Sequence, residues 1–296
     1  MELRQLATFV TVAKTKRFNQ TAELLSYAQS TITSHIQALE TELGVKLFER
    51  FGHHISLTRE GGVLLSYAEQ ILTLVDEAKE IVSFSEIPKG KLVIGTGESL
   101  STYRLPSVLQ EYRRNYPQVE IILKFSNCSN LRDLIRKNEV DVGLFIDREI
   151  TEPEFAVEVL AIEPMHFLAA PHHVLAQQKE VVPQDLDNEC LVLTEPGCSF
   201  RATIESILHE WNVKPRSILE ASSIESIKQF VMHDFGITML PHFTIESEIA
   251  NNRLVPLNWQ KHISAYMVQL VHHKNKHITP TLLSFLQTAR EKFSIK

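Results

Sequence analysis

Histidine and cysteine are the side chains of this sequence best suited to bind a metal ion or to react with an oxidant. The chain has 13 His, and they are densest at His53-His54, at His172-His173, and at His272-His273 with His277. Neighbouring side chains on a strand point to opposite faces, so such pairs rarely hold one ion together. We therefore expect no metal site.

The three cysteines, Cys128, Cys190 and Cys198, are an odd number and include no C-x-x-C pair. This pattern argues against a disulfide framework and against a thiolate zinc site. Cys190 and Cys198 lie eight residues apart, and Arg201 is close enough in sequence to give Cys198 the positive neighbour that a reactive thiol needs. Redox sensing by these thiols therefore stays open beside the simpler interpretation of buried, inert thiols.

The segment Gly95-Thr96-Gly97-Glu98-Ser99-Leu100 begins like a dinucleotide-binding fingerprint. It lacks the third glycine, and the chain contains neither a G-x-S-x-G motif nor a P-loop. We therefore expect no cofactor and no enzymatic activity.

Small polar residues follow several predicted strands, where they could bind a ligand. Hydroxyls and free backbone N–H groups at the starts of helices favour a small anion, above all a carboxylate, and Arg201 would add positive charge. The alternative is that these hydroxyls only cap their helices. The candidate binding positions are Ser99, Leu100, Ser101, Thr102, Asn127, Cys128, Gly197, Cys198, Phe200 and Arg201.

Strands and helices alternate from residue 90 onward and would position these groups. The predicted strands are Leu92–Gly95, Val119–Phe125, Val140–Ile146, His166–Ala170, Leu191–Thr194, Ile218–Ala221, Ile237–Pro241 and Ala265–Val271. The predicted helices are Leu105–Tyr116, Leu131–Asn138, Arg201–Trp211, Ser223–His233 and Thr279–Phe293. The alternation favours parallel sheets covered by helices, in two α/β lobes with a ligand crevice at the carboxyl ends of their strands.

Apolar residues at helical spacing predict three short helices near the start of the chain. The first begins at Leu3, the second covers about Asn19 to Leu25, and the third covers Ser30 to Leu43 and ends at Gly44. Two short helices joined by a tight turn are typical of a helix-turn-helix. The alternating segment Ile55-Ser56-Leu57 predicts a small β wing after it.

A long helix is predicted from Thr58 to about Phe84, ahead of the break at Pro88. Apolar residues recur along it in steps of four and three, which is heptad spacing. These residues are Leu64, Ala68, Ile71, Val75, Ala78 and Val82. A seam of this length buries little in one chain, so we expect it to pair with a second copy. The alternative is that the helix packs on its own domain.

Length and charge are compatible with a DNA-binding protein of two or more domains. The chain has 296 residues, 44% hydrophobic and 22% charged, which excludes intrinsic disorder. Residues 1–65 hold seven Lys/Arg against six Asp/Glu, which is a net charge of +1. Since the whole chain has a net charge of −6, residues 66–296 have a net charge of −7. No apolar run reaches the roughly 20 residues of a membrane helix, and no signal peptide is evident. We expect a cytoplasmic protein without a membrane partner.

Several motifs along the chain form one known pattern. The most specific is the continuous stretch Ile36–Arg50, IQALETELGVKLFER, and it is accompanied by Phe9, Phe18, Ala22, Leu25, Gln29, Leu57-Thr58 and Gly61. The second half adds Gly90-x-Leu92-x-Ile94-Gly95, Asp141-Val142-Gly143-Leu144 and Gly236-Ile237-x-x-Leu240-Pro241. In these residues the chain resembles the LysR-type transcriptional regulators over its whole length.

The resemblance implies an α+β chain of two parts. A winged helix-turn-helix would occupy residues 1–58, a dimerisation linker helix residues 59–87, and a two-lobed α/β effector domain, like the periplasmic binding proteins, residues 88–296. Lobe I would cover about 88–161 and 268–296, and lobe II about 162–267. The candidate binding positions given above would then contact the effector.

The resemblance also assigns DNA contacts to the third helix and the wing. The residues concerned are Gln29, Ser30, Thr31, Thr33, Ser34, His35, Arg50 and His53. Ala28 and Ser30 stand where the family usually has Ser and Pro, so either the helix cap is lost or Ser30 supplies it. Ser34 and His53 replace frequent arginines, so neutral hydrogen bonds should carry most of the base recognition.

We therefore predict a sequence-specific regulator that binds double-stranded DNA at dyad-symmetric operators as a homodimer or homotetramer. A small effector, a carboxylate or another anion, would modulate DNA binding or bending from between the lobes, and RNA polymerase is a further candidate partner. One alternative is a thiol-based redox-sensing regulator of the same family. The other is a solute-binding protein, which would need a signal peptide and would not need the first ninety residues.

Overall fold

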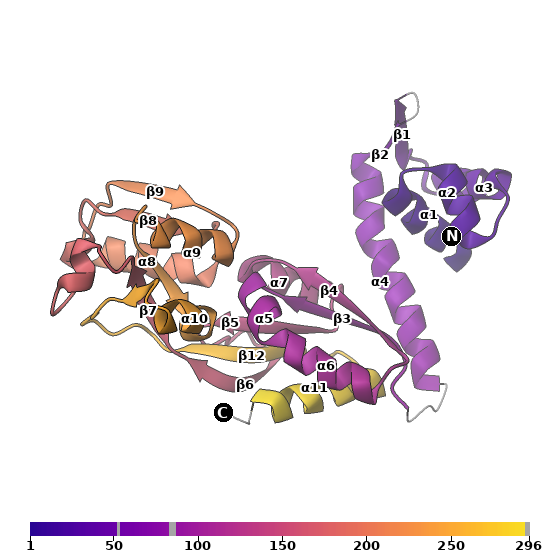
Figure 1. The fold of residues 1–296 in the computed structure, drawn as a ribbon. Coiled ribbons are helices and arrows are strands. Elements are labelled where there is room, and N and C mark those ends of the chain that lie inside the picture. The colour runs from indigo at the N-terminus through magenta and orange to yellow at the C-terminus, as the bar shows by residue number, and fades with distance from the viewer. Residues whose placement is uncertain (52–53, 83–86, 294–296) are drawn as a thin grey trace. The chain divides into compact units, whose positions relative to one another are not determined.

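The computed structural model describes residues 1–51, 54–82 and 87–293, and the chain divides into two units, Met1–Ser85 and Glu86–Lys296 (Figure 1). The first unit contains α1 (Leu3–Thr15), α2 (Phe18–Leu25), α3 (Gln29–Leu43), β1 (Phe48–Phe51), β2 (His54–Leu57) and α4 (Arg59–Val82). The second unit mixes strands and helices. This organisation confirms the predicted fold class. Among the described helices, none is both long and apolar enough to span a membrane.

The first unit is built on an apolar core between its helices and its wing. Phe48 of β1 packs against Phe9 and Phe18, with ring centroids 5.3 and 6.4 Å apart. A Cβ added to Gly61 would lie 2.1 Å from the carbonyl oxygen of Leu47, so only glycine fits at this point of α4. This close approach holds the first turn of α4 against the base of the wing.

Helix α3 begins at Gln29 after Ala28, which adopts the extended backbone of an N-cap residue. Within the described residues no side chain caps this end, so of the two alternatives for the helix start the structure shows the lost cap. The first N–H groups of α3 therefore have no side-chain acceptor of their own. The other end closes at Gly44 in the left-handed conformation, with φ of 70°, as predicted.

The predicted heptad seam on α4 is divided between two environments. Ala68 is buried, and Leu64 and Ile71 pack on the core of the first unit. Val75 is half-buried and Ala78 is exposed. The side chain of the last seam residue, Val82, lies outside the described residues. The first half of the seam therefore covers its own domain, which was the alternative to pairing.

The apolar face that α4 leaves uncovered in this unit lies beside the predicted seam. Its large residues are Val63, Tyr67 and Leu74, whose exposed fractions are 57%, 61% and 56%. Steps of four and seven residues place them on one stripe, next to Ala78. We call these three residues the α4 stripe.

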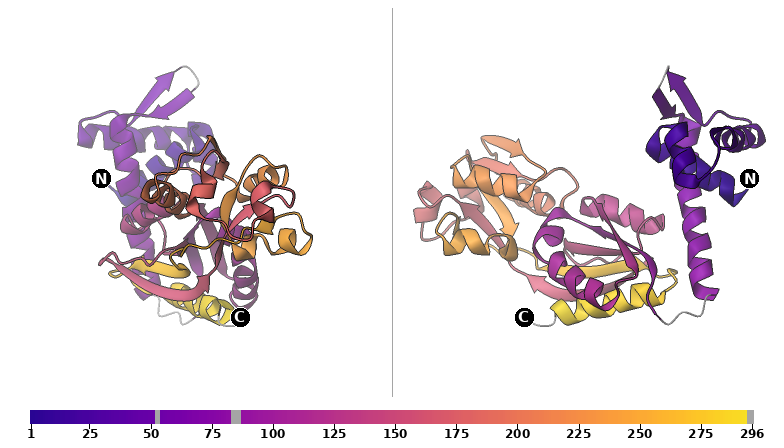
Figure 2. Two further views of the ribbon diagram at one scale, coloured as in Figure 1. Left: turned by 90° about the vertical axis from the view of Figure 1, so that its left-hand side faces the viewer. Right: turned by 45° about the vertical axis from the view of Figure 1, so that its right-hand side comes forward.

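The second unit begins with a three-layer lobe. Its elements are β3 (Gly90–Thr96), α5 (Glu98–Tyr103), α6 (Leu105–Asn115), β4 (Val119–Phe125), α7 (Cys128–Arg136), β5 (Val142–Asp147), β6 (Phe155–Glu163), β12 (Tyr266–His273) and α11 (Pro280–Phe293). The sheet order is β4-β3-β5-β12-β6. Helices α6 and α11 cover one face and α7 covers the other (Figures 1 and 2). Leu92 and Ile94 accordingly lie in the core with α6 and α11, while Gly95 faces Leu131 of α7.

This sheet is mixed, which corrects the predicted parallel sheet. Strands β4, β3 and β5 are parallel, but β12 runs antiparallel to both β5 and β6. Strand β6 is absent from the predicted strands because polar and apolar residues share both faces of this edge strand. The chain passes from β5 to β6 through a loop, so the sequence has no helical segment between them that would indicate a further strand.

The second lobe has smaller sheets. It contains β7 (Met165–Ala169), β8 (Cys190–Leu193), α8 (Ser199–Glu210), β9 (Ser217–Glu220), α9 (Ile224–Met232), β10 (Thr238–Pro241), α10 (Glu246–Ala250) and β11 (Val255–Pro256), with short 3₁₀ turns at Val174–Gln177, Pro183–Leu186 and His242–Thr244. Strand β7 pairs antiparallel with β10 and β11, and β8 pairs parallel with β9. A parallel bridge between Leu191 and Ile237 joins the two sheets.

Candidate functional site

Helix α3 carries a polar face that is available to a partner. Gln29, Ser30 and Ser34 are exposed, and Gln37, which is not among the predicted positions, is exposed on the same side. Thr31 and Thr33 are half-buried, and the Thr33 hydroxyl donates to the backbone oxygen of Gln29. The described polar face therefore consists of side chains that form neutral hydrogen bonds.

His35 differs from the other predicted DNA-contacting residues of α3. Its Nδ1 lies 2.8 Å from the hydroxyl of Thr8 on α1, and its ring packs edge-on against Tyr27. The structure therefore engages His35 inside the unit. For the wing, the side chain of Arg50 and the whole of His53 lie outside the described residues.

The second unit contains a small cavity of about 60 Å³ between its two lobes. The carboxyl ends of β3, β4, β5 and β8 and the starts of α5, α7, α8 and α9 converge there, as expected for a ligand site of α/β sheets. Its polar lining residues are Glu98, Ser99, Ser126, Asn127, Cys128, Thr194, Glu195, Cys198, Ser199 and Ser222. Of the predicted positions, the structure thus brings Ser99, Asn127, Cys128, Cys198 and Phe200 together around one cavity.

One buried hydroxyl in this lining, that of Thr194, lacks a hydrogen-bond partner of normal geometry in the described chain. Thr194, directly after β8, is 6% exposed, and among the described residues the only polar group that reaches its Oγ1 is the Cys198 thiol, a weak partner outside normal hydrogen-bond geometry. Ser99 is 5% exposed and lines the same cavity. A buried polar group normally has a full hydrogen-bond partner, so the Thr194 hydroxyl points to a ligand or water in the cavity.

Glu98 links the two lobes across the cavity. Its carboxylate accepts hydrogen bonds from the Ser223 hydroxyl at 2.9 Å and from the backbone N–H of Ile224 at 2.7 Å. It therefore binds the start of α9, where the helix dipole favours negative charge. The residue was absent from the predicted positions because its partner lies 126 residues further along the chain.

Asn127 and Gly197 form a second contact between the lobes. The Asn127 side chain caps α7 by accepting from Asn130 N–H, and its Nδ2 donates to the carbonyl oxygen of Pro196. Gly197 has φ of +89°, and a Cβ there would lie 3.0 Å from Asn127 Nδ2. Glycine thus allows both the turn and the approach of Asn127. The Asn127 side chain therefore has a capping role in the structure.

The two cysteines that lie at one site are not the pair singled out from the sequence, Cys190 and Cys198. Cys128 and Cys198 come from opposite lobes and both line the cavity, whereas Cys190 is buried at the start of β8. Burial, together with the nearby Asp147 carboxylate, raises the pKa of the Cys128 thiol to about 12. Burial also raises the pKa of the Cys198 thiol. Both groups are therefore protonated at neutral pH, which disfavours reaction with an oxidant.

The remaining predicted ligand positions lie away from the cavity or turn into the protein. Leu100 is in the core. The Ser101 hydroxyl donates to the backbone oxygen of Glu98, and Thr102 is exposed. Arg201 pairs with Glu205 at 2.7 Å and with Glu220 at 2.6 Å and donates to the backbone oxygen of Thr194 at 3.0 Å, so its charge already has partners within the protein.

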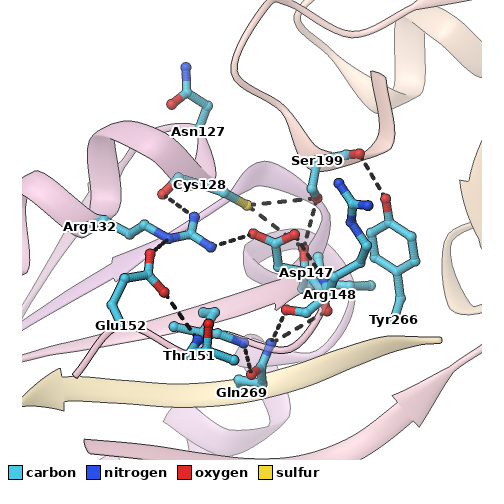
Figure 3. Close-up of polar contacts among 12 residues, drawn as sticks. Asn127, Cys128, Arg132, Asp147, Arg148, Thr151, Glu152, Ser199, Tyr266 and Gln269 are labelled. Atoms are coloured by element: carbon cyan, nitrogen blue, oxygen red, sulfur yellow. Dashed lines mark hydrogen bonds and ion pairs between the residues drawn. The ribbon is translucent and has the colours of Figure 1, made fainter. Parts of the chain in front are cut away.

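A wider groove of about 820 Å³ adjoins the cavity and shares Cys128, Cys198 and Ser199 with it. Arg132 of α7 lies in its wall, where its guanidinium binds Asp147 at 2.8 Å and Glu152 at 2.7 Å (Figure 3). These ion pairs anchor α7 to the end of β5 and the loop after it.

The floor of this groove is held by buried polar groups. Gln269 accepts from Ile150 N–H and donates to the backbone oxygen of Arg148, which fixes the turn after β5 (Figure 3). The Tyr266 hydroxyl donates to the backbone oxygen of Ser199 at 2.7 Å, and the Ser199 hydroxyl donates to that of Ile146 at 3.2 Å. The start of α8 is thereby tied to the first lobe.

None of the His, Cys, Asp and Glu side chains in the described ranges form a group of three that could hold a metal ion. The description of bacterial regulatory helix-turn-helix proteins of the LysR family matches residues 3–62, and that of the LysR substrate-binding domain matches residues 85–294. The chain belongs to the LysR family of transcriptional regulators. It is therefore a DNA-binding regulator with an effector-binding domain.

Relatives match the chain over its whole length. It is 39% identical over 294 residues to the HTH-type transcriptional regulator YwqM of Bacillus subtilis, covering 99% of this chain and 100% of that protein. It is 32% identical to the regulator YfiE of Escherichia coli, with 99% of each chain covered.

Solved structures share the fold of this LysR-family chain. A full-length OxyR variant from Pseudomonas aeruginosa superposes with a TM-score of 0.74 at 21% identity, covering 100% of this chain and 95% of that one. Full-length CbnR in complex with its target DNA superposes with a TM-score of 0.68 at 20% identity, covering 99% and 100%. At these identities the likeness shows the fold alone.

Proposed function

We propose that this regulator acts in the cytoplasm as a homodimer or homotetramer on dyad-symmetric operators, under the control of a small carboxylate bound between its lobes. We also propose that the winged helix-turn-helix ends at residue 58 and the dimerisation linker helix at residue 87. The relatives named above are transcriptional regulators, and no step of the proposal requires catalysis.

The first unit supports the DNA half of the proposal. The polar face of α3 presents Gln29, Ser30 and Ser34, which suit hydrogen bonds to base edges in the major groove. The uncapped start of α3 leaves backbone N–H groups for a DNA phosphate. The α4 stripe is an apolar surface of the spacing that pairs helices, and pairing two copies would present two α3 helices to two half-sites.

One observation carries the effector half of the proposal: Thr194 Oγ1 is buried in the cavity wall without a hydrogen-bond partner of normal geometry in the described chain. A ligand carboxylate can accept hydrogen bonds from this hydroxyl and from Ser99, at the meeting point of α7 and α8, whose starts favour negative charge. Glu98 already binds the start of α9 in this manner.

A thermal-shift screen of the full-length protein with small mono- and dicarboxylates tests this proposal. A ligand at about 100 times its Kd adds roughly 2.7 kcal/mol to the free energy of unfolding. We expect one or more carboxylates to raise the melting temperature of the wild type and of a Thr102→Ala control, whose side chain is exposed. The same carboxylate should not stabilise the Ser99→Ala/Thr194→Val variant. Equal shifts in all three proteins would place the ligand elsewhere.

A further inference from the structure

The charges around the cavity are unbalanced. Two carboxylates line it, those of Glu98 and Glu195, and the described residues of its wall include no Lys, Arg or His. A ligand that is only an anion would therefore meet negative side chains without a positive one. The hydroxyls and helix starts can bind a carboxylate, but the site as a whole favours a ligand that also carries a positive charge.

The two carboxylates differ in their hydrogen-bond partners. Glu98 is satisfied by Ser223 and by the start of α9. Glu195 follows β8 directly after Thr194, is half-buried, and its carboxylate forms no ion pair or hydrogen bond within the part of the chain described. Its charge contributes to the raised pKa of the Cys198 thiol, after the larger effect of burial, which places it close to the cavity wall.

Partners for a carboxylate and a partner for a cation thus lie in one cavity. The Thr194 and Ser99 hydroxyls and the starts of α7 and α8 line this cavity, and so does Glu195, whose carboxylate has no partner among the described residues. A ligand that carries both a carboxylate and a cation would have a partner for each charge, whereas a simple anion would lie near an unneutralised carboxylate.

We propose that the effector is a zwitterionic α-amino acid, with its carboxylate at the Thr194 and Ser99 hydroxyls and its ammonium group at Glu195. This inference rests on the proposed function and specifies the ligand class of that site. The cavity of about 60 Å³ is small and partly open, which favours a small ligand. A larger side chain requires the lobes to separate at the contact between Glu98 and α9, or to extend past Cys128 and Ser199 into the adjoining groove.

Matched ligands test the ammonium group separately from the carboxylate. Each amino acid, for example L-alanine or L-serine, is compared with its N-acetyl derivative, with its amide and with the carboxylic acid that lacks the amine. Isothermal titration of the full-length protein should show binding of one or more amino acids, and at least about tenfold weaker binding of the three analogues.

Glu195→Gln removes the charge and keeps the side-chain size, and Glu246→Gln, at an exposed glutamate of α10, is the matched control. The first variant should bind the amino acid at least about tenfold more weakly and lose its preference over the amine-free acid, while the control keeps both. Circular dichroism and the melting temperature without ligand check that the variants fold, which the half-exposed position of Glu195 favours.

The outcomes separate the two proposals. If amine-free carboxylates bind as tightly as amino acids and Glu195→Gln has no effect, the zwitterion inference fails while the carboxylate effector stands. If neither amino acids nor other carboxylates bind, both fail. If an amino acid binds equally well to the Ser99→Ala/Thr194→Val variant, its site is not this cavity, and the inference is overturned.

Discussion

The two units place their functional groups in opposite ways. In the first unit the polar side chains of α3 are exposed on a helix whose other face is fixed in the core. In the second unit the decisive residues, Thr194 and Ser99, are buried between the lobes, and the Thr194 hydroxyl lacks a hydrogen-bond partner of normal geometry in the described chain. An exposed face can meet a large partner such as DNA without rearrangement, whereas a buried cavity binds a small molecule and reports its presence through the contacts between the lobes.

The largest effect is expected when a charge is placed in α4, and it should differ between a core position and a position on the α4 stripe. Ala68→Asp places a charge in the core of the first unit and should lower its free energy of unfolding by about 3–5 kcal/mol. Leu74→Asp lies on the α4 stripe, so it should leave the fold intact and instead reduce the oligomer mass measured by light scattering. An unchanged mass for Leu74→Asp would show that pairing uses another surface.

Base recognition by α3 should produce an intermediate effect. Gln29→Ala removes an exposed amide that can bind a base through two hydrogen bonds, so the preference for the specific operator over scrambled DNA should fall by about 1–3 kcal/mol. Gln20→Ala, an exposed glutamine of α2, is the control. Fluorescence anisotropy with both DNAs measures the preference. Equal losses of affinity for the two DNAs would show that Gln29 contacts the DNA backbone instead of the bases.

Thiol reactivity should show the smallest effect at neutral pH. With a pKa of about 12, fewer than ~1 in 1,000 Cys128 side chains are thiolates at pH 8. Iodoacetamide should therefore modify Cys128 at least ~100-fold more slowly than a free cysteine, with a rate that rises with pH, as mass spectrometry of the modified peptides can measure. Because the folded-state pKa is raised, this thiol also favours unfolding as pH rises from about 8.5 towards 12. Fast oxidation of Cys128 or Cys198 by peroxide at pH 7 would restore the redox alternative.

Local patterns predicted much of the fold. The helices of the first unit, the Gly44 helix end and most strands of the second unit follow from periodicity and turn residues that act over a few positions. The edge strand β6 and the antiparallel β12 did not follow, because strand direction depends on the path of the chain between strands.

The cavity was predictable in position and less so in chemistry. Ser99, Cys128 and Cys198 follow or precede elements whose ends meet at the crevice, so topology alone brings them together. Thr194 and Glu195 follow the carboxyl end of a strand in the same way, so their position in the topology could also have predicted them. The Glu98 contact with α9 and the pairing of Arg201 with Glu220 depend on side chains distant in sequence, and no local pattern encodes them.

The most direct test of the account measures operator affinity with and without a ligand of the cavity. The probe is the amino acid or carboxylate that stabilises the full-length protein most in the thermal-shift screen. At saturation it should change the operator Kd of the wild type at least about fivefold, with the reciprocal change in ligand affinity when operator is bound. The Ser99→Ala/Thr194→Val variant should bind the operator like the ligand-free wild type at every ligand concentration. A ligand that occupies the cavity and leaves the operator Kd unchanged would contradict the control of DNA binding from between the lobes.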